Sequence, residues 1–362
     1  MGSCPKRMPT DSASIVLNTR FLAQELTGVQ RYGREMLVRF AGRLRTVEPE
    51  GKLSAIRGHL WEQYTLPRLC EGRLLWSPGN TGPLSVAHQV VTIHDASTLD
   101  HPEWFSRKFA LWYRFLLPRL AKKVRKVITV SEFSRQRLVE TCGIPTSQIE
   151  VVPNGIDSRF RPAGEDDVKS FRDKNHLDRP YFVYLGSLEP RKNVDRLLKA
   201  WKQLAWKEGE LVLAGAPGKI FRDRGYTELP QGIRLWGRVA EEDLTRLLTG
   251  AVGFVFPSLY EGFGFPALEA MACGCPALVS GTTSLPEVCG PAFDSSTGTG
   301  NAIYFDPLNS EALTAGIRQL IDLNETARGQ LRRNGIARAM EFNWDHSADL
   351  TGKVMQGVIN RA

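Results

Sequence analysis

The sequence predicts an α/β protein made of two doubly wound, Rossmann-like domains. Its 362 residues exceed what one ordinary hydrophobic core accommodates and suit two domains of common size. Short apolar runs alternate with segments of helical periodicity, a pattern typical of parallel sheets with helices on both faces. A polar, charged stretch near 161–179 interrupts this alternation and divides the chain into two runs of the same kind.

The elements of each run follow from the spacing of apolar residues. In the first run, strands are expected at 14–18, 89–94 and 126–131, and helices at 29–44 and 105–122. In the second run, strands are expected at 181–186, 210–215, 232–236, 252–257 and 276–279, and helices at 194–206, 241–248 and 266–273. The expected domains are 1–165 and 166–342, followed by a C-terminal helix over 343–362 that packs back towards the first domain. Ligands of such domains bind at the carboxyl ends of the strands, and two domains form a cleft that can close.

The composition is that of a soluble globular protein, with 42% hydrophobic and 24% charged residues. We expect no membrane span, since no apolar run reaches the roughly 18–20 residues that cross a bilayer. We expect no secretory signal either, because no apolar stretch occurs before Ser14. The six cysteines are scattered without zinc-site spacing, which favours reduced thiols in a cytoplasmic protein. The net charge of +8 points to an anionic partner such as nucleotide phosphates or a membrane surface. No aromatic-basic module for nucleic acid is visible, so nucleic acid is not expected as a partner.

The segment 254–280 (FVFPSLYEGFGFPALEAMACGCPALVS) carries the most chemistry. A strand ends in it, a glycine-containing loop follows, and a helix opens with a proline, which suits the first helical position. Gly262 and Gly264 allow the backbone to come close to a ligand, and the helix N-terminus favours an anion or clustered hydroxyls. Glu261 and Glu269 stand on either side of this loop, so both carboxylates can face one pocket.

Two other interpretations of this segment are open. Residues 262–267 (GFGFPA) match the dinucleotide fingerprint GxGxxA, and Glu287 lies twenty residues beyond it, so an oxidoreductase using NAD(P) is a rival enzyme. That fingerprint normally follows the first strand of its domain, whereas this match falls late in the second run. Glu269 could also serve only to complement the helix N-terminus.

A second segment, 184–193 (YLGSLEPRKN), places two cations just after a strand. Arg191 and Lys192 follow the carboxyl end of that strand, where their charges could offset the charge on a leaving diphosphate. A solvated basic turn is the alternative, because most charge runs lie at the surface.

With these two segments the chain resembles the retaining family 4 glycosyltransferases, in particular their bacterial mannosyltransferase-like branch. The spacing of Glu261 and Glu269 matches the family signature, and GSLEPRKN matches its phosphate-binding segment. Similar segments at TGVQRYGRE, TIHD, HPEWF, VITVSEFSRQRL and VVPNGID extend the resemblance over nearly the whole chain. The resemblance implies the GT-B architecture, in which two Rossmann-like domains face each other across a cleft. The acceptor would bind on the N-terminal side and the nucleotide-sugar donor on the C-terminal side.

The resemblance also implies roles for individual residues. The catalytic residues it implies are His94, Arg191, Lys192 and Glu261. The donor-binding residues it implies are Gly28, Gly186, Ser187, Gly237, Arg238, Val239, Glu261, Gly262, Phe263, Gly264, Phe265 and Glu269. Among these, Glu269 would accept hydrogen bonds from the ribose, the cations would bind the diphosphate, and 237–239 would lie by the nucleobase. A hydrogen-bonded loop histidine is the alternative for His94.

One position departs from the family pattern. Ser187 stands where many relatives have an arginine, five residues before the lysine, although the mannosyltransferase-like branch often lacks it. Arg191 would then supply the missing charge.

The implied reaction is transfer of a hexose with retention, by front-face attack or through a covalent intermediate. No cofactor and no metal are expected, and Glu165-Asp166-Asp167 is interpreted as a solvated acidic run in the linker. GDP-mannose is the favoured donor and a UDP-sugar the alternative. The acceptor would be a glycan or a polyprenyl-diphosphate-linked oligosaccharide in cell-surface polysaccharide or lipopolysaccharide O-antigen assembly. A non-catalytic nucleotide- or carbohydrate-binding protein is the rival from another class, and a basic RNA-binding protein is a more distant one.

Contact with the inner face of the cytoplasmic membrane is a further hypothesis. The segment 105–125 (FSRKFALWYRFLLPRLAKKVR) mixes aromatic, leucine and basic residues and could lie on an anionic membrane. The alternative is a helix that packs its apolar side onto the first sheet. Pro118 argues against one long helix here, since an interior proline kinks or breaks a helix. The oligomeric state is left open.

Overall fold

The computed structural model describes residues 14–24, 26–51, 53–215 and 230–361. The chain divides into two compact units: unit 1 is formed by Met1–Asn154 and Trp344–Ala362, and unit 2 by Gly155–Asn343. Residues 155–165, expected in the first domain, therefore lie in unit 2. Ile156 pairs there with Asn343, and the Ala163 N–H donates a hydrogen bond to Thr249 Oγ1 at 3.0 Å. Within the described ranges, no helix is long and apolar enough to cross a membrane.

Unit 1 is built on a six-stranded, fully parallel sheet in the order β2-β1-β3-β4-β5-β6. The strands are β1 (Ile15–Asn18), β2 (Arg45–Val47), β3 (Leu74–Ser77), β4 (Gln89–Thr92), β5 (Lys126–Thr129) and β6 (Ile149–Val151). The helices are α1 (Gly28–Arg39), α2 (Ala55–Leu60), α3 (Leu66–Cys70), α4 (Ser97–Asp100), α5 (Arg107–Lys123), α6 (Glu132–Cys142) and α15 (Trp344–Ile359). A π-helical turn over Trp61–Thr65 joins α2 to α3. The C-terminal α15 packs on α1, where the rings of Tyr32 and Trp344 lie 6.1 Å apart.

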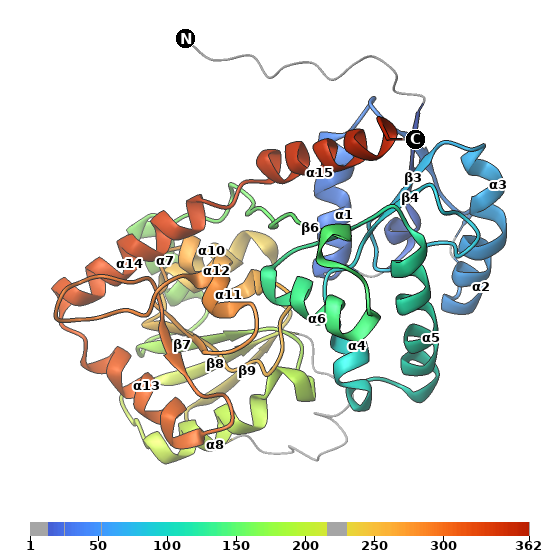
Figure 1. Ribbon diagram of the computed structural model, residues 1–362. Helices are drawn as coiled ribbons and strands as arrows, with labels where there is room; N and C mark the ends of the chain where they lie inside the picture. The colour runs from blue at the N-terminus through green and yellow to red at the C-terminus, as the bar shows by residue number, and fades with distance from the viewer. Residues whose placement is uncertain (1–13, 25, 52, 216–229, 362) are drawn as a thin grey trace, which may run out of the picture. The chain divides into compact units, whose positions relative to one another are not determined.

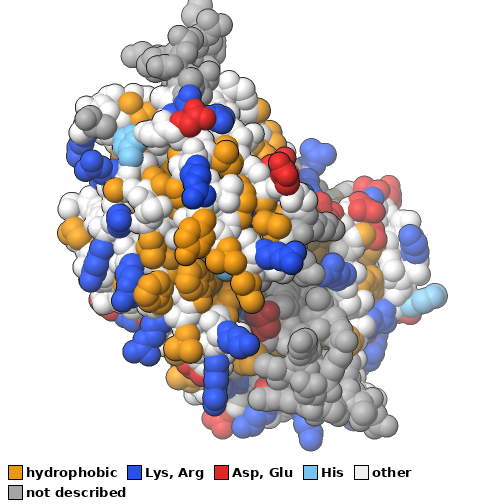
Figure 2. Space-filling view, turned by 90° about the vertical axis from the view of Figure 1, so that its right-hand side faces the viewer, with side chains coloured by type: hydrophobic (Ala, Val, Ile, Leu, Met, Phe, Trp, Pro, Cys, Tyr) orange, Lys and Arg blue, Asp and Glu red, His pale blue; other side chains and the backbone are white. Residues whose placement is uncertain are grey.

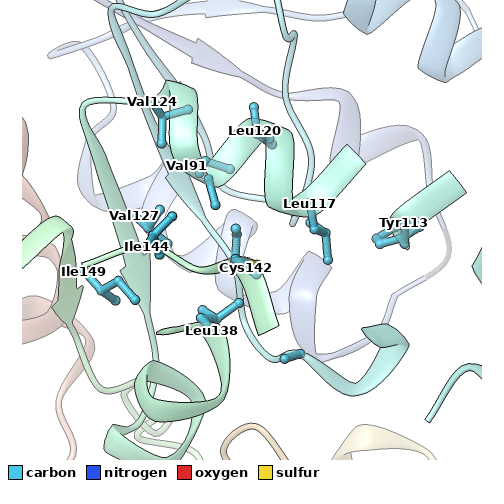
Figure 3. Packing of buried hydrophobic residues seen from close by; sticks show 13 residues of the cluster. Val91, Tyr113, Leu117, Leu120, Val124, Val127, Leu138, Cys142, Ile144 and Ile149 are labelled. Carbon is cyan, nitrogen blue, oxygen red and sulfur yellow. The ribbon is translucent and has the colours of Figure 1, made fainter. Parts of the chain in front are cut away.

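The core of unit 1 beneath α5 and α6 is drawn in Figure 3. Leu117 and Leu120 of α5 pack there with Val127 of β5 and Leu138 of α6, all of them fully buried. The helix expected over 105–122 is α5, which runs from Arg107 to Lys123 with Pro118 inside it, so the argument from Pro118 against one long helix is wrong. Pro118 leaves the Arg114 carbonyl without its helical donor, and because residue 114 is exposed, water can take that place.

Unit 2 contains a second six-stranded parallel sheet, in the order β12-β11-β10-β7-β8-β9. The strands are β7 (Tyr181–Leu185), β8 (Glu210–Ala214), β9 (Ile233–Gly237), β10 (Gly253–Phe256), β11 (Ala277–Ser280) and β12 (Ile303–Phe305). The helices are α7 (Glu165–Lys174), α8 (Val194–Leu204), α10 (Glu241–Thr249), α11 (Phe265–Ala272), α12 (Leu285–Cys289), α13 (Ser310–Asp322) and α14 (Glu325–Met340). Figure 1 shows α8 and α13 on one side of this sheet and α10, α11 and α12 on the other.

The strand order of unit 2 creates a switch point. From β7 the chain moves outwards to β8 and β9, then returns to place β10 on the opposite side of β7. At such a point the loops after the two neighbouring strands diverge, and the space between them is where doubly wound sheets bind ligands. A ligand site is therefore expected between the loops that follow β7 and β10.

The two parallel doubly wound sheets confirm the predicted fold class, and every strand and helix expected from periodicity exists within a few residues of its expected bounds. The charged stretch taken as a linker instead contains α7. Its Glu165, Asp166 and Asp167 occupy the first turn of that helix, where carboxylates complement the helix dipole.

Candidate active site

The switch point of unit 2 brings together two loops that are distant in sequence. A tight turn over Pro190–Lys192 follows β7, and residues 257–264 follow β10. The Leu259 N–H donates to the Arg191 carbonyl at 2.8 Å. The Asn193 side-chain amide donates to the carbonyls of Pro257 at 3.0 Å and Pro307 at 2.8 Å. Asn193 adopts a left-handed backbone with a φ of 57°, which asparagine tolerates better than most residues.

Lys192 and Glu261 form a buried ion pair at this junction. The Lys192 Nζ lies 2.5 Å from Glu261 Oε1, and the two residues are only 7% and 6% exposed. Ser258 Oγ donates to the same carboxylate oxygen at 2.6 Å. Arg191 Nη1 lies 4.0 Å from Glu261 Oε2, and its side chain keeps 23% of its surface exposed. Of the two cations, Arg191 is thus the one that reaches solvent.

Electrostatics keep this carboxylate ionised. Burial would raise the pKa of Glu261, but the charges of Lys192 and Arg191 hold that pKa below its ordinary value. Burial also lowers the pKa of Lys192, against the opposing effect of Glu261. A buried charge is stable only when paired, so each partner depends on the other.

Side chains after β11 hold the backbone of residue 261. The Glu261 N–H donates to Thr283 Oγ1 at 3.3 Å, and Ser284 Oγ donates to the Glu261 carbonyl at 2.9 Å. Ser258, Thr283 and Ser284 were not among the site residues expected from the sequence. The signal that could have found them is a set of hydroxyl residues just after β10 and β11, which are neighbours in the sheet.

The loop from Gly262 to Phe265 leads into α11 with its apolar side chains turned inwards. Phe263 is 4% exposed and packs against Phe265 and Phe342, with ring centroids 5.4 and 5.5 Å away. Gly264 has a φ of 101°, and a Cβ there would lie 2.6 Å from Leu285 Cδ2, so only glycine fits. The resemblance to family 4 implies that the backbone amides of 263–265 bind the donor, a role that does not require the buried ring of Phe263.

Glu269 lies in α11 and is 3% exposed. It stands beyond the first turn of the helix, which contains no acidic residue, so complementing the N-terminal dipole does not account for it well. The GFGFPA segment follows β10, the fourth strand of unit 2 in chain order. It therefore lacks the first-strand position that the dinucleotide fingerprint requires.

Glycines occupy the carboxyl ends of three neighbouring strands, β7, β8 and β9. The Gly186 N–H donates to the Ala214 carbonyl at 2.9 Å, and the Gly215 N–H to the Gly237 carbonyl at 2.7 Å. A Cβ on Gly215 would lie 1.9 Å from the Gly186 oxygen, whereas one on Gly237 would meet no described atom within 4 Å. The strand ends thus present bare backbone, and Gly215 is a member of the set that sequence reasoning missed.

The residues that follow these strand ends are also placed. Ser187 is half-buried and its carbonyl accepts a hydrogen bond from the Tyr184 hydroxyl at 2.8 Å. Arg238 is exposed and Val239 half-buried, directly after Gly237. These positions are open enough for a ligand to reach, which is what a nucleobase site after β9 requires.

Gly28 and His94 belong to unit 1 and are described there. Gly28 is the first residue of α1. His94 follows β4 and is 7% exposed, with its Nε2 3.0 Å from the Pro78 carbonyl, so Nε2 carries the proton. The Tyr32 ring meets the His94 ring edge-on at 4.8 Å, one helical turn after Gly28. Burial lowers the pKa of His94, which keeps the imidazole neutral near pH 7.

The structure therefore joins Arg191, Lys192 and Glu261 in one cluster, with Gly186, Ser187 and 237–239 along the adjoining strand ends. The described part of the chain contains no cluster of three or more His, Cys, Asp or Glu side chains able to hold a metal ion.

Comparison with protein families matches both units. The model described as "Glycosyl transferases group 1" matches residues 166–338, and the model described as "Glycosyltransferase Family 4" matches residues 74–160.

The chain is also similar to individual glycosyltransferases, in sequence and in fold. The chain is 31% identical over 279 residues to "O-antigen chain mannosyltransferase B" of Escherichia coli. The aligned region covers 74% of this chain and 70% of that protein. The chain is 30% identical over 304 residues to "MMP alpha-(1->4)-mannosyltransferase" of Mycolicibacterium hassiacum, covering 78% and 69%. The fold is similar to that of HepE from Anabaena, solved with UDP and glucose, with a TM-score of 0.75 at 16% identity over 95% of this chain and 99% of that one.

The fold and these matches define a glycosyltransferase of the GT-B type. The chain belongs to family 4 of these enzymes, among its mannosyltransferase-like members.

Proposed function

We propose that the enzyme transfers mannose from GDP-mannose, with retention of configuration, in the assembly of a cell-surface polysaccharide such as an O-antigen. The acceptor is a glycan or a polyprenyl-diphosphate-linked oligosaccharide at the inner face of the cytoplasmic membrane. The observation that carries the proposal is the Lys192–Glu261 pair, flanked by Arg191, at the switch point of unit 2.

Arg191 and Lys192 supply the positive charge that stabilises the departing nucleotide diphosphate. When the bond between the anomeric carbon and the diphosphate breaks, negative charge grows on the leaving oxygen. Arg191 and Lys192 stabilise that charge in the role that a metal ion plays elsewhere, so neither a metal nor a cofactor enters the proposal. The amides at the start of α11 add partial positive charge.

The carboxylates orient the donor. Glu261, ionised and fixed by Lys192 and Ser258, accepts hydrogen bonds from hydroxyls of the donor sugar. Glu269 accepts hydrogen bonds from the ribose. Gly237, where a Cβ would meet no described atom within 4 Å, leaves space for the flat base at the end of β9.

Two residues of unit 1 take the roles that the resemblance to family 4 implies for them. His94, which contacts Pro78 and Tyr32, acts on the donor sugar and the acceptor hydroxyl. Gly28, the first residue of α1, serves the phosphates. In front-face attack, the acceptor oxygen bonds to the anomeric carbon as the bond from that carbon to the diphosphate breaks, and the proton of the acceptor hydroxyl passes to the departing diphosphate. In the route through a covalent intermediate, an enzyme group first displaces the diphosphate, and the acceptor oxygen then displaces the enzyme group and gives up its proton to the released diphosphate. Both routes retain configuration.

Mannose is favoured because both relatives described above are named as mannosyltransferases. A UDP-sugar is the second candidate, since HepE was solved with UDP. The test is a panel of nucleotide sugars incubated with the purified protein and a mixture of glycan acceptors. Release of GDP from GDP-mannose supports the proposal. Release of UDP from a UDP-sugar, with no release of GDP, would show that a UDP-sugar is the donor instead.

A non-catalytic nucleotide- or carbohydrate-binding protein is the other class to exclude. Such a protein is stabilised against heat by GDP, as any ligand of the native state stabilises it, yet releases no nucleotide from any donor. Nuclear magnetic resonance of the product's anomeric proton then tests retention.

A further inference from the structure

One face of unit 1 exposes large apolar side chains from two separate helices. We name it the α2–α5 face and define it by Ile56, Leu60 and Tyr64 on α2 and the π-helical turn, and by Phe109, Leu111 and Phe115 on α5. These six side chains are between 39% and 74% exposed. They make up six of the eleven strongly exposed large apolar side chains among the described residues, so they form a concentration and not the usual scatter. Figure 2 faces the side where Figure 1 draws α2 and α5, and shows apolar side chains gathered there among Lys and Arg.

Ring contacts hold the two helices of this face together. The His59 ring of α2 lies 5.3 Å from the Trp112 ring and 6.5 Å from the Tyr113 ring of α5. The two helices therefore lie side by side, on the same side of unit 1.

The exposed apolar side chains of α5 are separate from the side chains with which this helix packs into the core of unit 1. The opposite side of α5 buries Tyr113, Leu116, Leu117 and Leu120 within unit 1. The helix does pack on its own unit, as the alternative interpretation of 105–125 requires, but it keeps a second apolar side in solvent.

The face is also strongly basic. The chain has no acidic residue between Glu103 and Glu132. Within that interval α5 carries six cations, all of them exposed: Arg107, Lys108, Arg114, Arg119, Lys122 and Lys123. The Arg119 guanidinium lies 4.1 Å above the Phe115 ring, so cation and apolar surface are interleaved. Glu62 in the π-helical turn is 1% exposed and paired with Arg20, so it adds no negative charge to the surface.

We propose that the α2–α5 face binds the surface of an anionic lipid bilayer. Exposed Phe, Leu and Ile side chains enter the boundary between headgroups and acyl chains, and the surrounding Lys and Arg side chains pair with lipid phosphates. A second copy of this chain fits poorly, because a two-fold contact sets this basic face against itself. Nucleic acid fits poorly too, because its phosphates would leave the apolar centre in water.

Binding of a bilayer by the α2–α5 face rests on the proposed function only in that the proposed acceptor is linked to a lipid. Bilayer binding needs no nucleotide sugar, and release of GDP in the absence of lipid needs no bilayer. Either can therefore fail without the other.

The test is co-sedimentation of the full chain with vesicles of phosphatidylcholine, with and without phosphatidylglycerol. Wild-type protein sediments with the anionic vesicles, and added salt weakens this binding. Removing three cations with Lys108→Gln, Arg114→Gln and Lys122→Gln weakens partitioning by about 100-fold. The apolar variants Leu111→Ser with Phe115→Ser, and Ile56→Ser with Leu60→Ser, each weaken it by about tenfold or more.

Matched controls lie in unit 2. Leu308→Ser with Met340→Ser removes two equally exposed apolar side chains, and Lys199→Gln, Lys202→Gln and Arg318→Gln remove three exposed cations. These variants bind vesicles as the wild type does. Circular dichroism confirms that each variant is folded.

Several results overturn the proposal. One is that the wild-type protein does not sediment with anionic vesicles. Another is that a control variant of unit 2 weakens vesicle binding as much as the matched variant of the α2–α5 face. Binding that depends on the cations but not on either apolar pair also rejects insertion of this face. A dimer in solution that the apolar variants convert to a monomer assigns the face to a second copy instead.

Discussion

Lys192 and Glu261 meet at 2.5 Å although 69 positions separate them, because the strands before them, β7 and β10, are neighbours at the switch point of unit 2. Each is almost fully buried, so the pair is a structural unit as well as a candidate part of the active site.

Breaking the pair from one side should destabilise the protein. Lys192→Met leaves the Glu261 carboxylate buried without its main partner, which costs about 3–5 kcal/mol in the free energy of unfolding. The double variant Lys192→Met with Glu261→Gln should recover part of that loss, because no unpaired charge remains. Urea unfolding of the single and double variants measures this, with Lys199→Met on exposed α8 surface as control. Equal stability of Lys192→Met and the control would contradict a buried ion pair.

Arg191 should matter for transfer more than for folding. Its side chain is more exposed than that of Lys192 and lies farther from Glu261, so Arg191→Ala should lower the free energy of unfolding less than Lys192→Met does. Loss of a cation that stabilises the leaving diphosphate lowers turnover by about a hundredfold to a thousandfold. Steady-state release of nucleotide from the donor measures this, with Lys202→Ala as the matched exposed control. Normal turnover in Arg191→Ala removes this residue from the site.

The row of strand-end glycines predicts a steric effect. Gly215→Ala places a methyl group 1.9 Å from the Gly186 oxygen, so β7 and β8 must move apart. We expect a lower melting temperature and loss of the stabilisation that the nucleotide gives the wild type. Gly357→Ala in α15, where a Cβ meets no described atom within 4 Å, should instead stabilise the protein by about 0.5–1 kcal/mol. Thermal scans with and without GDP distinguish the two, and an unchanged response of Gly215→Ala to GDP rejects close approach of the nucleotide there.

The buried His94 predicts a dependence of stability on pH. Burial holds the pKa of His94 below its ordinary value of 6.5, so the unfolded chain takes up its proton first as the pH falls. The stability that the neutral imidazole gives is fully present above pH 6.5 and is lost as the pH falls towards the lowered pKa. His94→Gln should flatten the fall in unfolding free energy below pH 6.5, by at most about 1.4 kcal/mol per pH unit. Denaturant titrations at several pH values test this, and an unchanged slope would mean that another group titrates there.

Sequence reasoning recovered the fold because apolar runs and helical periodicity are local signals. It did not locate four short strands, β2, β3, β6 and β12, or several helices, among them α6, α13 and α14. The first two residues of β2 are exposed, and α7 has too few apolar residues to show a periodicity. It counted Pro118 against one long helix because a missing N–H is costly in a buried helix, whereas this proline lies on a partly exposed side of α5.

The candidate site was predictable as a set of residues but not as an arrangement. Arg191, Lys192 and Glu261 were identified separately, and nothing local to either segment says that Lys192 is neutralised by Glu261. That pairing follows from the strand order, which a single sequence does not encode as a local pattern. The hydroxyls of Thr283 and Ser284 were missed for the same reason, since their partner is a backbone more than twenty residues away.

We expect the switch point of unit 2 to bind a nucleotide-sugar diphosphate beside the Lys192–Glu261 pair. A crystal structure of the protein with GDP would show whether it does. Diphosphate oxygens should then lie within hydrogen-bonding distance of Arg191 or Lys192 and of the first amides of α11, with the base near Gly237. GDP bound at another place, with the Lys192–Glu261 junction left to solvent, would contradict it.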